Sequence, residues 1–407
     1  MNVDVAIVGA GPAGLAASIE LARAGLSVAV VDEYYRPGGR LLGQLYDDPQ
    51  APAGQRRWDG RKVAAELLAQ ARQWNVQVLS GVTAWSVQPS WQIELSGAAV
   101  QTLRAKALLL ATGACEKALP IPGWTLPGVV SIGAAQTFTN LHRVAIGRRV
   151  MVVGADPLAL SVALEMKHAG IEVVGVALPP QSPWSGELAS PVQAVARLAE
   201  AADLAPHPLL RRMGRLAAGR LRALAAHALR WPLLRLAGVP LYLRQAVTRI
   251  EGSTAVEAVT LQPVSIDGVP TGRAERVAVD AVCLSAGLYP LIDLAQVAGC
   301  TLVELPELGG LVPLHSRDLR TSVEGLYVAG NITGIEGAKV AMAQGRLAAV
   351  SIAAAWGKTA SLSLDEALAA VEAARARSPL RFLPRIAEGR AKMEQLWQAA
   401  HGEKGGG

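Results

Sequence analysis

The alternation of apolar runs and small-residue turns at the start of the chain predicts a strand, a helix and a second strand. The run VDVAIV (residues 3–8) leads into the turn GAGPAG, an alanine- and leucine-rich segment follows, and VAVVDE (28–33) closes the pattern. Short apolar runs bounded by turn residues are typical of buried strands in parallel sheets. An apolar run that ends in a glycine turn recurs at residues 103–114 and 279–290.

Two further stretches extend this pattern. A second strand–turn–helix–strand begins at Arg148, and residues 325–356 form a strand that leads into a long helix. Together they predict an α/β fold with two Rossmann-like domains, the second inserted into the first. We expect residues 1–118 and 280–356 to form the first domain and residues 119–279 to form the second.

The segments between and after these domains have their own signals. Residues 120–129 contain three prolines and two glycines, which favours an extended crossover between the domains. Residues 191–236 are rich in arginine, leucine and alanine and predict an insertion of two or three amphipathic helices. Residues 357–407 predict a tail of two surface helices with a frayed end.

The composition is that of a globular protein, with 51% hydrophobic and 18% charged residues. No run of about 18 uncharged apolar residues occurs, so we expect no membrane span. The chain begins directly with a strand, without a charged leader, which favours the cytoplasm. Its three cysteines, Cys115, Cys283 and Cys300, are far apart and form no CxxC, so we expect no metal or iron–sulfur site.

The net charge of +6 is unevenly distributed along the chain. Nine arginines and no acidic residue lie between Leu204 and Ile250, which leaves 6 − 9 = −3 for the rest. This asymmetry suggests a local anionic partner and not a nucleic acid. A solvated helix face or a subunit interface explains the same arginines.

The first strand–helix–strand unit carries a dinucleotide fingerprint. In GxGxxG spacing, Gly9 permits the tight turn, Gly11 admits a pyrophosphate to the helix N-terminus, and Gly14 allows close helix–strand packing. Asp32, at the end of the next strand, is expected to accept the ribose hydroxyls, with Glu33 beside it. The motif alone does not separate FAD from NAD.

The rest of the chain resembles one superfamily. The turn ATGA (111–114), the segment TSVEGLYVAGN (321–331) and the helix after it resemble the glutathione-reductase and thioredoxin-reductase superfamily of two-domain flavoproteins. RPGGRLLGQ (36–44) and the linker TGACEKALPIPGWTLPGVVSIGAAQT (112–137) are similar to one subgroup, the FAD-binding subunits of multisubunit amine-oxidising dehydrogenases. Its members include the A-type chain of opine oxidase, the B-type chain of hydrogen cyanide synthase, the α chain of dye-linked proline dehydrogenases and sarcosine-oxidase-α-like proteins.

This resemblance implies a set of contacts with FAD. Gly38, Gly39, Arg40 and Gln44 would lie over the flavin, although Arg40 is also compatible with a solvated loop charge. Thr112 and Gly113 would touch the phosphate or ribityl side, and Gly330 and Asn331 the ribityl chain. Where the superfamily has an acid, this chain has the uncharged Asn331. The remaining expected contacts are Pro12, Ala13 and Val82.

The second unit departs from its fingerprint. Gly154, Asp156 and Ala159 occupy the three glycine positions. Asp156 followed by Pro157 is a good helix start, so the carboxylate is expected to bind the N–H groups that would otherwise bind a phosphate, and to repel a pyrophosphate. The next strand ends without the acid or arginine expected for NAD or NADP. A working NAD(P) site is therefore doubtful, and a degenerate domain or a site for another adenine nucleotide or anion stays open.

No catalytic residue can be assigned from the chain. His315 could approach the flavin or be a satisfied loop histidine, and Cys115 follows the expected flavin-facing turn. The resemblance implies the FAD-bearing subunit of a heteromeric dehydrogenase acting on proline, sarcosine, an opine or glycine. Its partners would be a substrate-oxidising flavoprotein and a small iron–sulfur protein. Two alternatives are a free-standing NAD(P)H-dependent reductase of a quinone, dye or ferredoxin, and a scaffold subunit with structural FAD.

Overall fold

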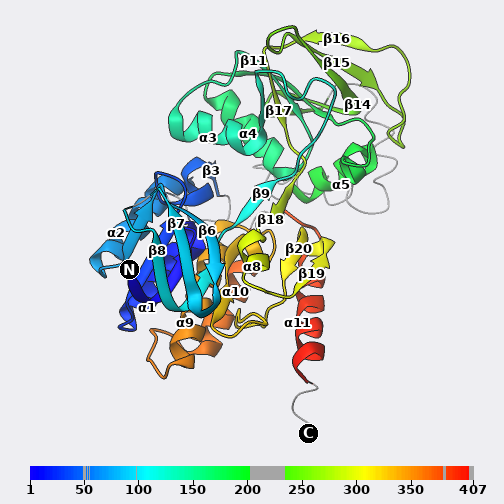
Figure 1. The fold of residues 1–407 in the computed structure, drawn as a ribbon. Coiled ribbons are helices and arrows are strands. Elements are labelled where there is room, and N and C mark those ends of the chain that lie inside the picture. Colours follow the sequence, from blue (N-terminus) through cyan, green and yellow to red (C-terminus); the bar gives the residue numbers. More distant parts are fainter. Residues whose placement is uncertain are drawn as a thin grey trace. The chain divides into compact units, whose positions relative to one another are not determined.

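The chain forms two compact units (Figure 1). A computed structural model describes residues 1–48, 52, 54, 56–97, 99–201, 234–378 and 382–402. Unit 1 comprises Met1–Leu42, Asp59–Cys115 and Leu288–Gly407, whereas unit 2 comprises Gly43–Trp58 and Glu116–Gly287. The second unit is thus inserted into the first. The division differs from the expected one in three respects: Gly43–Trp58 belongs to unit 2, the C-terminal helices belong to unit 1, and residues 280–287, which were expected in the first domain, belong to unit 2.

A largely parallel sheet forms the centre of unit 1. Its strands follow the order β5-β2-β1-β8, and the free edge of β8 is shared by two strands. β7 pairs with the start of β8 in antiparallel fashion, and β21 pairs with its end in parallel fashion. The strands of the sheet are β1 (Asn2–Val8), β2 (Val28–Asp32), β5 (Gln77–Ser80), β6 (Thr83–Gln88), β7 (Gln92–Ser96), β8 (Thr102–Leu110) and β21 (Leu326–Val328).

Two helices of unit 1 pack tightly against each other. α1 (Pro12–Arg23) and α9 (Ala338–Ala355) approach so closely that a Cβ at Gly345 would lie 2.1 Å from the Ala13 carbonyl oxygen. The other elements of the unit are η1 (Gly39–Gly43), which runs into unit 2, α2 (Gly60–Gln73), η2 (Pro89–Trp91), α8 (Asp293–Val297), β19 (Leu302–Leu305), η6 (Pro306–Leu308), β20 (Gly310–Pro313) and η7 (Gly330–Thr333).

The C-terminal tail is part of unit 1 and is not merely a surface appendage. It forms α10 (Leu364–Ala376) and α11 (Ile386–Gly402). α10 begins with a capping box, in which Ser363 and Glu366 bind each other's backbone N–H. On α11, Met393 is buried with Leu305, Leu308, Val312 and Leu314. The expectation of two helices was correct, but their apolar contacts make them part of the core.

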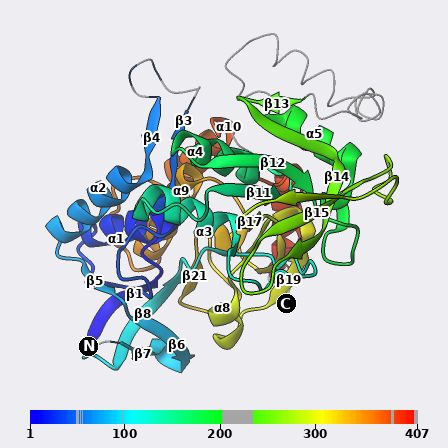
Figure 2. The ribbon, with the colours of Figure 1, turned by 90° about the horizontal axis from the view of Figure 1, so that it is seen from above.

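A second, mixed sheet forms the centre of unit 2 (Figure 2). Its order is β10-β17-β11-β12-β14-β15-β16, with β13 beside β14. Long strand β14 runs parallel to β12 near Leu241 and antiparallel to β15 from Gln245. The strands are β10 (Val129–Ser131), β11 (Arg149–Val153), β12 (Glu172–Leu178), β13 (Arg235–Leu236), β14 (Val239–Glu251), β15 (Ala258–Pro263), β16 (Glu275–Ala278) and β17 (Ala281–Leu284).

The remaining elements of unit 2 include a hairpin-like pair early in the sequence. The pair is β3 (Leu45–Asp47) and β4 (Arg57–Asp59), which bond to each other in a separate two-stranded sheet. The helical elements are α3 (Ile132–Thr137), η3 (Phe138–His142), α4 (Pro157–His168), η4 (Gly186–Ala189) and α5 (Pro191–Ala201).

The crossover between the units does not lie where the sequence analysis expected it. Besides the passages before and after Gly43–Trp58, the chain passes between the units after Cys115 and after Gly287. The strands there, β9 (Ala114–Glu116) and β18 (Leu288–Pro290), pair with each other. Residues 120–129 are therefore not the crossover. They belong to unit 2, because Leu119 and Ile121 are buried in its core and Pro122 accepts a hydrogen bond from Ile250.

The arginine-rich insertion is described only in part. α5 provides one of the expected helices, but residues 202–233, with six of the nine arginines, lie outside the described residues. Arg235 was expected at the end of the helical region and instead begins β13, which pairs antiparallel with β14. In the parts of the chain that are described, no helix is long and apolar enough to cross a membrane.

Candidate functional site

The carboxyl ends of four neighbouring strands meet at one edge of the unit 1 sheet. β2, β1, β8 and β21 lie side by side and parallel, so the turns that follow them share this edge. Backbone hydrogen bonds join the turns: Gly9 donates to Val31, Ala111 to Val8, and Ala329 to Leu110. In parallel α/β sheets this edge is where ligands bind.

The three fingerprint glycines have different surroundings. Gly9 has a φ of +107°, and a Cβ there would lie 2.3 Å from the Ala111 carbonyl oxygen. A Cβ on Gly14 would lie 1.9 Å from the Gly9 carbonyl oxygen. A Cβ on Gly11, the N-cap of α1, would meet nothing within 4 Å among the described residues. Gly9 and Gly14 are thus required by packing, whereas Gly11 borders open space at a helix N-terminus.

Asp32 shapes this turn. Its carboxylate accepts hydrogen bonds from the backbone N–H of Ala10, at 2.6 Å, and of Tyr34, at 2.9 Å. Burial raises the pKa of Asp32 above its ordinary value, against the effect of these hydrogen bonds. Glu33 is exposed. The two carboxylates therefore differ: Asp32 holds the glycine-rich turn in place, while Glu33 faces solvent at the end of β2.

The loop after β2 crosses over the glycine-rich turn. Gly38 donates its N–H to the Ala10 carbonyl, and a Cβ on Gly39, whose φ is +52°, would lie 3.0 Å from the Cα of Gly11. Exposed Arg40 donates to the Ala114 carbonyl at 3.1 Å, so it is not simply a solvated charge. These contacts place Gly39 beside Gly11 and bring the Arg40 side chain to Ala114, after the turn that follows β8.

The turn after β8 lies at the same edge. Thr112 donates its hydroxyl to the Leu291 carbonyl at 2.6 Å, and Gly113 accepts from the Leu291 N–H. Gly113 has a φ of +79°, and a Cβ there would meet nothing within 4 Å among the described residues. The Thr112 hydroxyl is thus engaged with protein, and the Gly113 backbone is the open surface of this turn.

The turn after β21 is held by one side chain of α9 and by one of its own. Gln344 of α9 accepts a hydrogen bond from the Gly330 N–H at 2.8 Å, and Asn331 accepts one from the Glu336 N–H at 3.1 Å. A Cβ on Gly330, whose φ is +80°, would lie 3.0 Å from the Cβ of Ala13. Long helix α9 starts at Ala338, after η7 at residues 330–333.

Two expected flavin contacts are placed differently from the rest. Gln44 lies in unit 2, where its side-chain carbonyl accepts a hydrogen bond from the Trp58 indole at 3.0 Å. The side chain of Val82 is buried in the unit 1 core, and its N–H donates to the Asp32 carbonyl. Pro12 opens α1, and Ala13 lies buried against α9.

In unit 2, the helix N-terminus of the fingerprint is capped by Asp156, which belongs to the fingerprint itself. Asp156 Oδ1 accepts from the N–H of Leu158 at 2.9 Å and of Ala159 at 3.0 Å, and Oδ2 accepts from the Ser285 hydroxyl. Asp156 is buried and is the N-cap of α4, with a proline opening the helix, as the sequence predicted. Gly154 keeps the fingerprint geometry, with a φ of +114°. The first-turn N–H groups that would meet a phosphate are therefore already bonded to a carboxylate.

The candidate catalytic side chains are constrained. His315 is buried, and its Nδ1 donates to the Pro313 carbonyl. Burial, together with the charges of Arg390 and Arg375, lowers the pKa of His315 to about 3, so it is neutral at physiological pH. Cys115 is half-buried and raises the pKa of its neighbour Tyr289. Within the described ranges no cluster of His, Cys, Asp or Glu could hold a metal ion.

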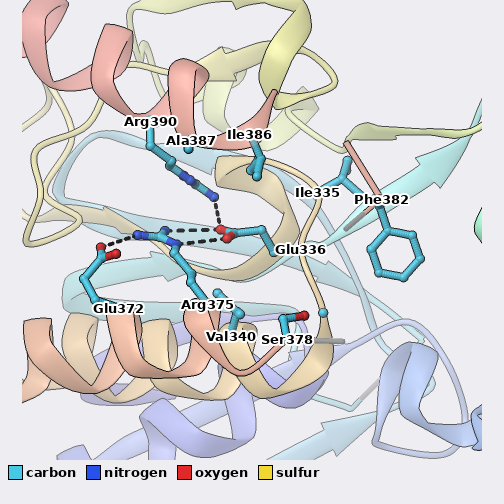
Figure 3. Close-up of a pocket in the computed structure, with 11 residues that line it drawn as sticks. Ile335, Glu336, Val340, Glu372, Arg375, Ser378, Phe382, Ile386, Ala387 and Arg390 are labelled. Atoms are coloured by element: carbon cyan, nitrogen blue, oxygen red, sulfur yellow. Dashed lines mark hydrogen bonds and ion pairs between the residues drawn. The ribbon is translucent and has the colours of Figure 1, made fainter. Parts of the chain in front are cut away.

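Sequence reasoning missed a buried ion-pair cluster in unit 1. Glu336, just before α9, lies between Arg375 of α10 and Arg390 of α11 (Figure 3). No local pattern identifies this cluster, because the pairs are 39 and 54 residues apart in the sequence. The predicted tail contains five arginines, and nothing in the sequence singles out Arg375 and Arg390 among them.

The edge of unit 1 fits a dinucleotide. A pyrophosphate must come close to the backbone N–H groups at a helix N-terminus, and Gly11 leaves the space there open. A ribose needs an accessible hydrogen-bond acceptor, and the exposed carboxylate of Glu33 provides one. Gly113 adds a second open stretch of backbone. At the corresponding place in unit 2, the Asp156 carboxylate does not fit a phosphate.

Comparisons with known proteins agree with this geometry. Residues 3–345 match the pyridine nucleotide-disulphide oxidoreductase family. The A-type chain of opine oxidase from Agrobacterium tumefaciens is 31% identical over 360 residues, 85% of this chain and 64% of that protein. The HcnB chain of hydrogen cyanide synthase from Pseudomonas protegens is 30% identical over 353 residues, 86% of this chain and 70% of that protein.

A solved structure shows the same fold. The L-proline dehydrogenase from P. horikoshii superposes with a TM-score of 0.64 at 23% identity, covering 92% of this chain and 59% of that chain. This chain spans less than two thirds of that protein and of the Agrobacterium relative. The resemblance inferred from the turn and linker motifs is confirmed, and the chain belongs to the pyridine nucleotide-disulphide oxidoreductase family.

Proposed function

We propose that this chain binds FAD at the carboxyl edge of the unit 1 sheet and relays electrons within a heteromeric dehydrogenase. The substrate would be a secondary amine or an amino acid, such as proline, sarcosine, an opine or glycine. One partner would be a substrate-oxidising flavoprotein, and another a small iron–sulfur protein. The curated relatives are named as subunits, which supports a hetero-oligomer.

The main support for this proposal is that the first fingerprint is open and the second is closed. Gly11 leaves the first helix N-terminus open, whereas Asp156 caps the second from within. A reductase that takes hydride from NAD(P)H needs the second site. A chain with only the first site open is better suited to receive electrons from another polypeptide.

The residues of unit 1 would divide the binding of FAD among them. The backbone at Gly11 and the N-terminal end of α1 would bind the pyrophosphate, because helix N-termini favour anions. Glu33 would accept the ribose hydroxyls, while Asp32 would keep the turn in shape. Gly113, Gly330 and Asn331 would border the ribityl side. When bound, the flavin supplies the two-electron redox chemistry.

The experiment is to isolate the assembled complex from its native cells through a tag on this chain. Dye reduction is then measured with proline, sarcosine, an opine and glycine, alongside the chain produced alone. We expect the complex to reduce the dye with one of these substrates and the isolated chain to be inactive with all four. Activity of the isolated chain, or none with the complex, would contradict the proposal.

A matched variant separates an electron-relaying flavin from a structural one. Gly11→Ala is introduced into the same tagged chain and the complex is isolated again. If this flavin relays electrons, the variant complex assembles but loses dye reduction together with its flavin. Full activity after loss of this flavin would make the chain a scaffold.

A further inference from the structure

A cavity of about 230 Å³ lies within unit 1, where the start of α9 meets α10 and α11 (Figure 3). Its apolar lining includes Ile335, Val340, Phe382 and Ile386. Ligand pockets for drug-sized molecules are typically larger, about 300–1,000 Å³, so this cavity suits a smaller molecule. Because much of the lining is aliphatic or aromatic, we expect a ligand of this cavity to have an apolar part.

One wall of the cavity carries two arginines and one buried acid. Arg375 binds both oxygens of Glu336, at 2.9 and 3.2 Å, and Arg390 binds one of them at 2.5 Å. Burial opposes ionisation of Glu336, but the two guanidinium groups hold its pKa below the ordinary value, so it is charged. A single carboxylate, 9% exposed, thus pairs with two arginines whose side chains are 24% and 14% exposed.

The two arginines differ in their acidic partners. Arg375 also donates to Glu372 at 2.7 Å, although the Glu372 side chain is 63% exposed and water screens this pair. His315, which interacts with the charge of Arg390, is neutral at physiological pH. Among the described residues Arg390 therefore pairs only with Glu336, a carboxylate that it shares with Arg375.

One donor in this wall lacks an acceptor. Arg390 directs Nη1 to the carbonyl and hydroxyl oxygens of Thr333, at 2.8 and 3.1 Å, and Nη2 to Glu336. Its Nε is buried and has no hydrogen-bond partner among the described residues. A buried N–H without an acceptor is costly, and Arg390 lines the cavity. An oxygen of a ligand would satisfy this donor.

We propose that this cavity binds a small aliphatic monocarboxylate. Its carboxylate would accept a hydrogen bond from Nε of Arg390 and give this guanidinium a carboxylate that it does not share, and its chain would lie against Ile335, Val340 and Ile386. The apolar walls disfavour inorganic phosphate, which has no apolar part. This site is separate from the proposed role of Gly11 and does not depend on it.

The test is calorimetric titration of the full chain with pentanoate, with 1-pentanol and inorganic phosphate as comparison probes. We expect saturable binding of pentanoate and no comparable binding of the other two. If pentanol binds as well as pentanoate, or no probe binds saturably, the proposal is overturned. Flavin content is recorded on the same samples, so failure of this site and failure of FAD binding are distinguished.

Two variants locate the binding. Arg390→Lys keeps the charge but removes Nε and its fork, and is expected to weaken pentanoate binding about tenfold or more. Ala387→Leu fills the cavity from its exposed rim and is expected to weaken binding similarly, without removing any ion pair. The second variant keeps the test valid if the first fails to fold.

Matched controls sit on the same helices outside the cavity. Arg377→Lys changes an exposed arginine at the end of α10, and Ala391→Leu enlarges an exposed alanine of α11. Both are expected to bind pentanoate as the wild-type chain does. Equal binding in the wild-type chain and in both cavity variants would place the ligand elsewhere and refute the assignment.

Discussion

At the scale of single residues, the three fingerprint glycines differ in their surroundings, although the motif requires a glycine at each of the three positions. Gly9 and Gly14 are fixed by the protein itself, because a Cβ on either would lie within 2.3 Å of a backbone oxygen. Gly11 has no such neighbour among the described residues. We therefore propose that a ligand, and not the fold, accounts for its lack of a side chain.

This difference predicts opposite behaviour for two alanine variants. Gly11→Ala should fold with a stability loss below about 1 kcal/mol, since only the N-cap preference changes, but should lose its flavin because the methyl group enters the pyrophosphate space. Gly14→Ala should lose about 3 kcal/mol or more, because its Cβ overlaps the Gly9 carbonyl. Urea unfolding and the flavin-to-protein ratio measure both effects.

Two results would contradict these roles of Gly11 and Gly14. A Gly11→Ala protein that keeps full yellow colour and an unchanged flavin ratio would show that no pyrophosphate lies at Gly11. A Gly14→Ala protein as stable as the wild type would show that α1 can move away from the turn.

Residues whose roles depend on near neighbours were predictable from the sequence. Asp156 was expected to cap α4 and does so, because the N–H groups it binds are two and three residues away. Asp32 was expected to accept the ribose hydroxyls, and this stays a prediction. Its hydrogen bonds from the backbone N–H of Ala10 and Tyr34 were not expected, and the one from Ala10, 22 residues away, depends on β1 and β2 lying side by side.

At the scale of elements, the start of α4 depends on Asp156. Replacing it with Ala removes the acceptor of two backbone N–H groups and of the Ser285 hydroxyl, which is buried. We expect unit 2 to lose roughly 2 kcal/mol of stability. Urea unfolding of the variant, compared with Ser363→Ala at the more exposed cap of α10, measures the difference. A smaller loss at Asp156 than at Ser363 would contradict the description.

Helix α4 also carries a buried acid that should make unit 2 sensitive to pH. Glu165 accepts hydrogen bonds from Gln136, Asn140 and Ser161, and Asn140 also donates to the Gly43 carbonyl. Burial raises the pKa of Glu165 to about 7, although these hydrogen bonds act in the opposite direction. The cluster thereby joins α4, η3 and the segment leading into β3.

The raised pKa fixes the sign of the pH effect. Between about pH 4.5 and about pH 7 the folded chain keeps the Glu165 proton that the unfolded chain has lost, so stability falls as the pH rises through this window. The full change is about 3 kcal/mol. Glu165→Gln should flatten this slope while Glu257→Gln, at an exposed position, leaves it unchanged. An identical slope in Glu165→Gln would show that this carboxyl is not the cause.

Element types followed from the apolar pattern, but their partners did not. The strand–helix–strand stretches at the start of each unit appear where the sequence placed them. The proline-rich stretch at 120–129 was assigned to a crossover, because its own residues give no sign that Leu119 and Ile121 enter a core. Likewise, Gly43–Trp58 joins unit 2 through α3, η3 and α4, which follow much later in the chain.

At the scale of the whole molecule, the two units differ in whether their fingerprint is open. Unit 1 holds the open fingerprint and unit 2 a fingerprint closed by its own carboxylate. The family and the insertion of one unit in the other were accessible from sequence motifs. The cluster of Glu336, Arg375 and Arg390 was not, because it depends on how the tail helices pack.

The most direct test of the central claim is anaerobic. The purified yellow protein is mixed with NADH and then with NADPH at micromolar concentrations, and the long-wavelength absorbance of the flavin is followed. We expect no rapid bleaching by either nucleotide, while dithionite still reduces the flavin, because Asp156 closes the second site. Rapid bleaching by NADH or NADPH would contradict it, and would make the chain a free-standing reductase whose second unit binds the nicotinamide.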